Sequence, residues 1–168
     1  MAPLILVLGG ARSGKSRHAE RLIGEYPPPW LYVATAEALD EEMRARIAAH
    51  RARRDERWQT IEAPHDLAEA LRNVPRDRPL LVDCLTLWLS NRLIADADVE
   101  PEIAVFGEAL QARAGPTVVV SNEVGLGIVP DNALARRFRD TAGVANQLIA
   151  SRADRVDFIA AGLPLRLK

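Results

Sequence analysis

Residues 9–16 constrain the fold more than any other part of the sequence. They read GGARSGKS and fit the pattern G-x-x-x-x-G-K-[ST] at every fixed position. An apolar run at residues 4–8 precedes them, and a helical pattern at residues 15–26 follows. A phosphate-binding loop lies between a buried strand and a helix in this way. In such a loop, backbone N–H groups and the helix N-terminus bind phosphate oxygens, so we expect a nucleotide site here.

The residue types in this loop indicate separate roles. Glycines let the backbone approach the phosphates closely, because a side chain would block that approach. Lys15 is expected to act in catalysis by reaching the β- and γ-phosphates, and the Ser16 hydroxyl is expected to hold Mg²⁺. The predicted nucleotide-binding residues of the loop are Gly9, Gly10, Ala11, Arg12, Ser13, Gly14, Lys15 and Ser16.

Apolar runs alternate with longer helical stretches along the rest of the chain. This alternation is typical of βαβ units and predicts an α/β fold, with a mostly parallel sheet and helices on both faces. Strands are expected at residues 4–8, 30–35, 59–63, 79–84, 116–122 and 155–162. Helices are expected at residues 15–26, 37–58, 65–74, 85–94, 101–114 and 133–153, with a loop at residues 123–132. No Pro-, Gly- or Ser-rich linker divides the chain, so residues 1–168 are expected to form one domain.

The charge balance and the cysteine content exclude several classes of protein. The net charge of -1 gives no general attraction to nucleic acid or anionic lipid. No apolar run approaches the length of a membrane span. The one cysteine, Cys84, cannot form an internal disulfide and fits a reducing compartment. The first residues read as a strand and not as a signal peptide, so we expect a cytoplasmic protein.

A phosphate-binding loop needs an acidic residue for the metal at the end of a neighbouring strand. Asp83 ends the run LLVD, and Glu123 follows the run VVVSN. Asp83 fits the pattern of an apolar run followed by aspartate better, and it is the predicted metal ligand beside Ser16. A helix N-cap is the alternative for Asp83. The sequence leaves the choice between Asp83 and Glu123 open.

A histidine lies among arginines in the expected helix at residues 37–58. Arg46, His50, Arg53 and Arg54 have spacings that would place them on one helical face. The arginines would bind phosphate and disfavour a charged imidazole, so His50 would be neutral and able to attack phosphorus. A solvated basic helix with an incidental histidine is the alternative. His18 is expected on the surface of the first helix, and His65 at the surface or as a cap.

Six segments occur in the order of a known family. They are GGARSGKSRHAE, YVATAE, DEEMRARIAAHRARR, VDCLTLWLSN, SNEVGLGIVPDN and ARRFRDTAGVANQ. Together they closely resemble the bifunctional adenosylcobinamide kinase / adenosylcobinamide-phosphate guanylyltransferase of cobalamin biosynthesis. The resemblance implies a RecA-like P-loop fold. It also implies that ATP or GTP phosphorylates adenosylcobinamide, and that GMP then passes from GTP through a histidine to the phosphorylated product.

The resemblance also assigns residues and an assembly. His50 matches the histidine that becomes guanylylated, and the family forms homotrimers. Further nucleotide contacts are implied at Ala34, Thr35, Ala36, Arg51, Ala52, Arg53, Arg54, Glu62 and Cys84. We also expect the loop after the strand at residues 116–122 to border the site, with Asn122 and Glu123 facing the ligand. A purely structural turn built on Gly125 and Gly127 is the alternative.

Two other functions are compatible with the phosphate loop. A one-step kinase of a small metabolite would use Lys15 and Ser16 and would not need His50. A nucleotide-dependent binding module would turn over little substrate. The chain lacks the N-K-x-D motif of switch GTPases, so a switch GTPase is disfavoured. It also lacks the LSGGQ motif of transporter ATPases, so a transporter ATPase is disfavoured.

Overall fold

The computed structural model describes residues 2–168, apart from the side chain of Arg46. Strands and helices alternate along most of the chain. In order they are β1 (Leu4–Gly9), α1 (Lys15–Ile23), β2 (Trp30–Ala34), α2 (Glu41–Ala52), β3 (Trp58–Glu62), α3 (Leu67–Arg72), β4 (Leu80–Asp83), α4 (Leu85–Ile94), α5 (Val99–Gln111), β5 (Thr117–Asn122), α6 (Ala133–Arg152), β6 (Arg155–Ala160) and β7 (Leu163–Arg166).

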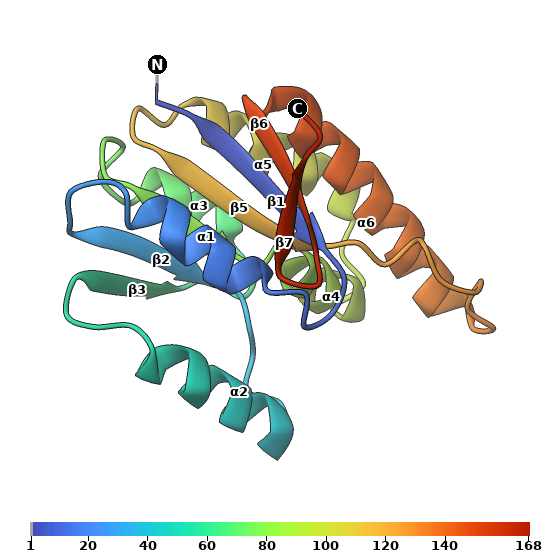
Figure 1. The fold of residues 1–168 in the computed structure, drawn as a ribbon. Helices are drawn as coiled ribbons and strands as arrows, with labels where there is room; N and C mark the ends of the chain where they lie inside the picture. The colour runs from blue at the N-terminus through green and yellow to red at the C-terminus, as the bar shows by residue number, and fades with distance from the viewer. Residues whose placement is uncertain (1) are drawn as a thin grey trace.

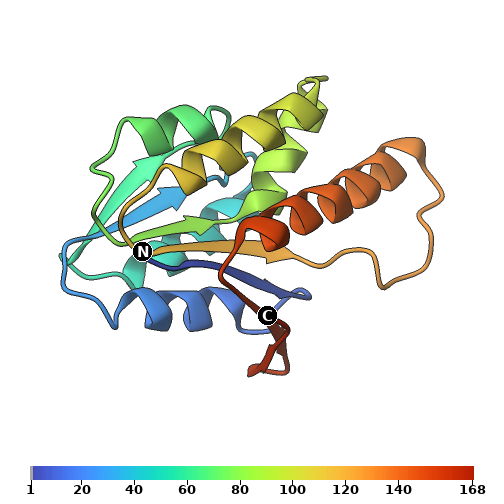
Figure 2. The ribbon, with the colours of Figure 1, turned by 90° about the horizontal axis from the view of Figure 1, so that it is seen from above.

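The strands form a seven-stranded sheet in the order β3-β2-β4-β5-β1-β6-β7. Every neighbouring pair is parallel except β6 and β7, which are antiparallel. Helix α1 covers one face, and α3, α4, α5 and α6 cover the other (Figures 1 and 2). Parallel strands need such cover because both of their faces are apolar. The α/β class, the mostly parallel sheet and the helices on both faces are therefore confirmed.

The two faces of the sheet carry separate hydrophobic clusters. On the α1 face, Ile23 packs with Trp30 and Tyr32 of β2. On the other face, Trp88 of α4 and Phe106 of α5 are fully buried against the strands. These clusters fix the sheet, so that the carboxyl ends of β1, β2, β4 and β5 meet at one edge. No helix in the described part of the chain is long and apolar enough to cross a membrane.

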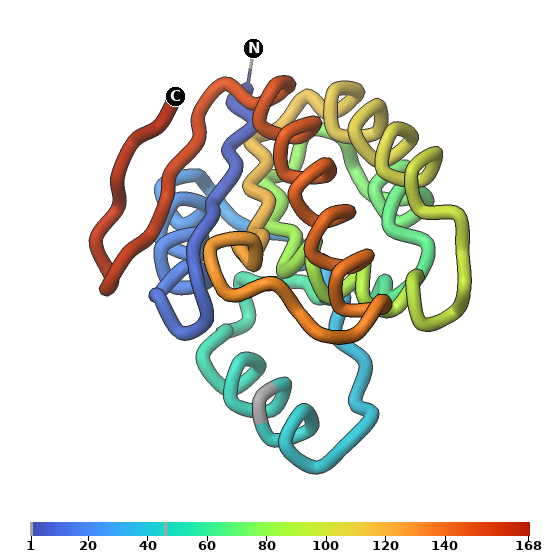
Figure 3. The backbone as a smooth tube through the Cα atoms, turned by 90° about the vertical axis from the view of Figure 1, so that its right-hand side faces the viewer, coloured from blue at the N-terminus to red at the C-terminus, as the bar shows by residue number. Residues whose placement is uncertain are grey.

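The second helix differs from its expected range of 37–58. Helix α2 begins after Asp40, whose Oδ1 accepts a hydrogen bond from the Met43 N–H at 2.7 Å. It ends at Ala52, and residues from Trp58 already belong to β3, beside β2. Helix α2 is therefore shorter than expected at both ends, by about three turns in all. Helix α2 follows the carboxyl end of β2 and stands apart from the other helices (Figure 3).

The strand β7 was not expected. The last strand was predicted to continue to residue 162, but β6 ends at Ala160 and the chain reverses through Ala161 and Gly162. Their φ angles of 51° and 79° are both positive, as a two-residue hairpin turn with the twist of its strands requires. Gly162 between two alternating runs was the available signal for this hairpin.

Candidate active site

A cavity of about 970 Å³ lies at the carboxyl edge of the sheet. The phosphate loop and α1 form one wall, and α2 with the following loop forms another. The predicted site residues that line the cavity are Ala11, Arg12, Ser13, Gly14, Lys15, Ser16, Ala34, Ala36, His50, Arg51, Arg53, Arg54, Glu62, Asp83 and Cys84. Ligands of open α/β sheets bind at this edge, beyond the carboxyl ends of the strands.

Four residues that were predicted to bind nucleotide do not line the cavity: Gly9, Gly10, Thr35 and Ala52. Gly9 is the last residue of β1, and a Cβ there would lie 2.5 Å from the carbonyl oxygen of Ile159. Thr35 is completely buried. Its hydroxyl donates to the carbonyl of Cys84 at 2.7 Å and accepts from the Cys84 N–H at 2.8 Å. Thr35 therefore fixes the chain after Asp83 and does not face the cavity.

Lys15 is the first residue of α1 and is only 7% exposed. Its Nζ donates to the carbonyl oxygen of Gly10 at 2.5 Å, so the side chain folds back along the loop. Burial lowers the pKa of Lys15, while the neighbouring Cys84 and Asp83 oppose that shift. The ammonium group therefore lies over the loop, and the carboxylate of β4 is close enough to favour its charge.

Asp83 ends β4, and its Oδ2 accepts a hydrogen bond from the Tyr32 hydroxyl at 3.0 Å. The N-cap alternative for Asp83 is wrong, because Cys84 occupies that position before α4. Burial raises the pKa of Tyr32, and the Asp83 carboxylate raises it further, so the phenol stays a donor. Tyr32 also lines the cavity. Tyr32 was not predicted as a site residue, because a tyrosine inside an apolar strand resembles a core residue.

The residues of this cavity that could bind a metal ion offer oxygen atoms as ligands. Ser16 and Asp83 both line the cavity, and hydroxyl and carboxylate oxygens suit Mg²⁺. Glu123 lines the cavity as well, but its Oε1 accepts a hydrogen bond from the Gly125 N–H at 2.6 Å. The described residues contain no group of three or more His, Cys, Asp or Glu residues that could hold a metal ion without a ligand. Mg²⁺ commonly binds through one or two protein oxygens, with water and substrate phosphate oxygens as its other ligands.

The loop after β5 borders the cavity only at its start. Asn122, Glu123 and Val124 line the cavity. The Asn122 amide donates to the Thr86 hydroxyl at 2.7 Å, which ties β5 to α4. Residues 125–129 are exposed, and the whole range 123–132 is irregular, as expected for a loop.

His50 lies in the last turn of α2 and faces the cavity. The expected single helical face is wrong for Arg53 and Arg54, because the helix ends at Ala52. Both arginines nevertheless line the same cavity as His50. The expectation for the Arg46 side chain lies outside the described residues.

Ion pairs hold the basic residues around His50 in place. Arg51 pairs with Glu62 at the end of β3, and Arg53 lies 3.6 Å from Glu20 of α1. Burial raises the pKa of Glu20, and Arg53 opposes this shift. The guanidinium of Arg54 lies over the Tyr32 ring, 3.6 Å from its centroid. The wall that carries His50 is thus joined to α1 and β2, which carry the groups nearest the phosphate loop.

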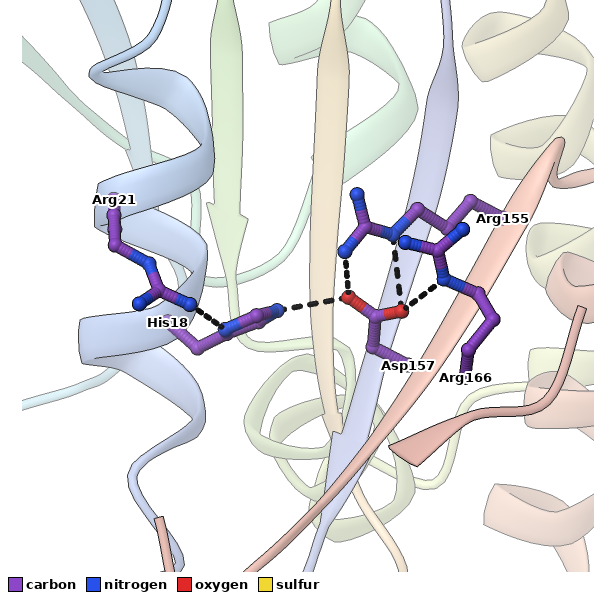
Figure 4. Close-up of polar contacts among 5 residues, drawn as sticks. All are labelled: His18, Arg21, Arg155, Asp157 and Arg166. Atoms are coloured by element: carbon purple, nitrogen blue, oxygen red, sulfur yellow. Dashed lines mark hydrogen bonds and ion pairs between the residues drawn. The ribbon is translucent and has the colours of Figure 1, made fainter. Parts of the chain in front are cut away.

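The other two histidines have structural partners. His65 is on the surface, and its Nε2 lies 2.9 Å from Glu37. The surface position expected for His18 is wrong, because the residue is only 7% exposed. Its Nε2 lies 2.8 Å from Asp157 Oδ2 on β6 (Figure 4). The sequence gives no local signal for this contact, because the two partners lie 139 positions apart.

The chain is similar to several known proteins. The family described as cobinamide kinase / cobinamide phosphate guanyltransferase matches residues 5–167. The bifunctional adenosylcobalamin biosynthesis protein CobP of Pseudomonas aeruginosa is 52% identical over 166 residues, which cover 97% of this chain and 96% of that protein. The bifunctional adenosylcobalamin biosynthesis protein CobU of Salmonella typhimurium is 41% identical over 181 residues, with 98% and 99% covered.

A solved structure supports the fold independently. The RadB recombinase superposes with a TM-score of 0.53 at 16% identity, over 94% of this chain and 74% of the recombinase. At this identity the likeness concerns the fold alone, and it agrees with a RecA-like P-loop architecture. The family match spans the phosphate loop, the His50 segment and the loop after β5 together. The chain therefore belongs to the cobinamide kinase / cobinamide phosphate guanyltransferase family.

Proposed function

We propose that this protein carries out two successive reactions of cobalamin biosynthesis in the cavity described above. ATP or GTP first phosphorylates the hydroxyl group of adenosylcobinamide. GMP is then transferred from GTP, through a guanylyl-histidine at His50, to adenosylcobinamide phosphate, which gives adenosylcobinamide-GDP. The observation that carries the proposal is that the phosphate loop and His50 line one cavity.

In the first reaction, the loop N–H groups and Lys15 bind the phosphates and stabilise the charge on the transferred phosphoryl group. Ser16 and Asp83 would hold Mg²⁺, which neutralises negative charge on the phosphate oxygens when it is bound. Tyr32 orients the Asp83 carboxylate through the bond to Oδ2. The wider nucleotide contacts expected at Ala34, Ala36, Arg51, Glu62 and Cys84 are supported by their place in the cavity lining.

In the second reaction, an unprotonated ring nitrogen of His50 attacks the α-phosphorus of GTP. A phosphorus–nitrogen bond forms while the bond to the bridging oxygen breaks, and pyrophosphate leaves. Arg53 and Arg54 lie on the same cavity and would neutralise the charge that develops. A phosphate oxygen of adenosylcobinamide phosphate then attacks the same phosphorus and releases His50. Two half-reactions through a covalent intermediate predict ping-pong kinetics.

We also propose a homotrimer that works in the cytoplasm. The loop after β5 exposes Leu126, Ile128 and Val129, and α6 exposes Leu134 and Val144. Ile128 is 96% exposed and Leu126 is 83% exposed. Neighbouring apolar side chains that are this strongly exposed to solvent are typical of an interface between proteins. Light scattering coupled to size-exclusion chromatography measures the mass, and a monomer at micromolar concentration would contradict the trimer.

The experiment for the main proposal uses GTP with a radioactive α-phosphorus. The protein is incubated with this GTP and Mg²⁺, denatured, and tested for label that is lost in acid and kept in base, as a phosphoramidate requires. We expect label on the wild type and none on His50→Ala. His65→Ala is the matched control, because it removes a surface histidine outside the cavity and should keep the label.

The same experiment separates the alternatives. Absence of label, with adenosylcobinamide still phosphorylated, would support the one-step kinase. Nucleotide binding without turnover of adenosylcobinamide would support the binding module. Label that remains in His50→Ala would place the nucleophile elsewhere.

A further inference from the structure

Asp157 of β6 is the centre of a buried polar cluster outside the proposed reaction steps. It is 1% exposed and accepts hydrogen bonds from three side chains (Figure 4). His18 lies 2.8 Å from Oδ2, Arg155 donates to both oxygens at 3.0 and 2.7 Å, and Arg166 donates to Oδ1 at 3.0 Å. Burial alone would raise the pKa of Asp157, but these bonds outweigh it and lower the pKa. The carboxylate thus joins α1, β6 and β7.

The hydrogen bonds define the state of the His18 ring. Arg21 Nη2 lies 2.9 Å from His18 Nδ1. A guanidinium has only donors, so Nδ1 must accept, and the ring proton is on Nε2. Nε2–H therefore donates to Asp157 (Figure 4). Each of the two ring nitrogens of His18 thus has one hydrogen-bond partner, and the ring cannot rotate without losing both bonds.

The β6–β7 hairpin also touches the phosphate loop directly. The Gly162 N–H donates to the carbonyl of Ser13 at 2.8 Å. A Cβ on Gly14 would lie 3.4 Å from Gly162 Cα, and Gly162 itself lines the cavity. The hairpin turn therefore packs against the loop, and the Asp157 cluster holds the other end of the same hairpin.

We propose that His18 and Asp157 form a positioning pair that clamps the β6–β7 hairpin onto the phosphate loop. His18 is within one turn of Lys15 and Ser16 on α1, so a bond that fixes His18 also fixes the start of the helix. The hairpin turn then sets the path of the loop at Ser13. The pair thereby holds the loop N–H groups and Lys15 where the phosphates of the nucleotide bind. This inference rests on the proposed use of the loop by ATP or GTP.

The test compares two substitutions of His18. His18→Phe keeps a ring of similar size but removes the donor to Asp157. His18→Gln places an amide N–H near the position of Nε2, and it can restore that donor. The affinity for a non-hydrolysable ATP analogue with Mg²⁺ is measured by calorimetry, beside kcat and KM for the phosphorylation of adenosylcobinamide.

We expect His18→Phe to weaken analogue binding about tenfold, the size of one lost charge-assisted hydrogen bond. We expect kcat to fall while KM for adenosylcobinamide stays within about twofold, because the proposed role of the pair is to position the phosphate loop and not to bind that substrate. His18→Gln should recover most of the affinity. A phenylalanine variant with wild-type affinity, or a glutamine variant as weak as it, would overturn the proposal.

Thr117→Val is the matched control. It removes a buried hydrogen bond from Arg113, 3.0 Å long, at the opposite end of the sheet from the phosphate loop. It should lower the melting temperature without changing analogue affinity. An equal loss of affinity in Thr117→Val would mean that general loosening of the fold explains the effect, and the positioning role would be rejected.

Arg166→Gln keeps the proposal testable if His18→Phe does not fold. Arg166 is largely exposed, so its loss removes one bond to Asp157 without opening the core. Hydrogen exchange of the Gly162 amide should accelerate, and analogue affinity should fall about threefold. Unchanged exchange or unchanged affinity would contradict the clamp. A wild-type protein that neither binds the analogue nor phosphorylates adenosylcobinamide would instead refute the proposed function.

Discussion

The Tyr32 hydroxyl donates to Asp83 Oδ2 at 3.0 Å, while the Arg54 guanidinium lies over the same ring at 3.6 Å. One side chain of β2 thus contacts the acid expected to hold the metal and a cation of the His50 wall. The two proposed reactions are therefore joined physically at Tyr32. A change at this ring should affect both of them.

Tyr32→Phe removes the hydroxyl and keeps the ring beneath Arg54. We expect phosphorylation of adenosylcobinamide to slow roughly fivefold, with more Mg²⁺ needed for half-maximal rate, because Asp83 loses its orienting donor. The free energy of unfolding should fall by about 1 kcal/mol. Rates across a Mg²⁺ titration and urea unfolding measure these effects. Tyr26→Phe, outside the cavity lining, should match the wild type in both; an equal loss there would contradict the explanation.

Lys15→Met keeps the length of the side chain and removes the ammonium group. Phosphoryl transfer should slow on the order of 100-fold or more, as for other preorganised charges at transferred groups. The melting temperature should not fall, because burial disfavours the charge of Lys15 in the native state. A single-turnover assay and a thermal scan test both statements. A wild-type rate would exclude Lys15 from the reaction.

Cys84 should react slowly with iodoacetamide in the native protein. The thiol is 4% exposed, and burial raises its pKa to about 11. A free cysteine has a pKa of about 8.5. The fraction of Cys84 present as the reactive thiolate should therefore be lower by a factor on the order of 100. Mass spectrometry of native and guanidinium-unfolded samples at slightly alkaline pH compares the two rates. Equal rates would show that Cys84 is accessible in the folded state.

Asp157→Asn should change how stability depends on pH. Because the folded-state pKa of Asp157 is lowered, its ionisation contributes stability that is fully present above its unfolded pKa, about 3.9. That contribution is lost as the pH falls through the lower folded-state pKa. The variant should therefore have a lower free energy of unfolding than the wild type at neutral pH. This gap between the two free energies should narrow below about pH 4.

Urea unfolding at several pH values measures this gap. Asp55→Asn is the control: hydrogen bonding to Arg57 also lowers the pKa of Asp55, but the group is exposed and its pair should contribute little. A pH-independent gap for Asp157→Asn would contradict the assignment.

The parts of the fold that local sequence specifies were predictable. The strand, loop and helix around Lys15 follow from a motif and two periodic patterns. The buried strands at Leu80–Asp83 and Thr117–Asn122 were clear because both of their faces are apolar. The end of α2 was not predictable, because the pairing of Trp58 with Trp30 on β2 overrides the helical periodicity there.

The residues of the candidate site also differ in whether the sequence could predict them. The phosphate loop and Asp83 carry local signals. The arginines around His50 made it a candidate nucleophile, but the family resemblance was needed to prefer that role over a solvated basic helix. Tyr32, His18 and Asp157 were missed, because each gains its role from a contact with a residue far along the chain. A histidine three residues after Lys15 has the sequence signature of a surface position, and only the sheet order brings Asp157 beneath it.

The place of β1 between β5 and β6 has a consequence for synthesis. A ribosome makes the phosphate loop before either of its neighbours in the sheet, and a domain generally folds as a unit during synthesis. The neighbours of this loop on both sides, Asn122 beside Gly9 and the hairpin turn at Gly162, are made much later. A nascent chain that has been made as far as α6 contains Asn122 but still lacks the hairpin turn that contacts the loop. Nucleotide binding should therefore begin only when translation of the β6–β7 hairpin is complete and it has left the exit tunnel.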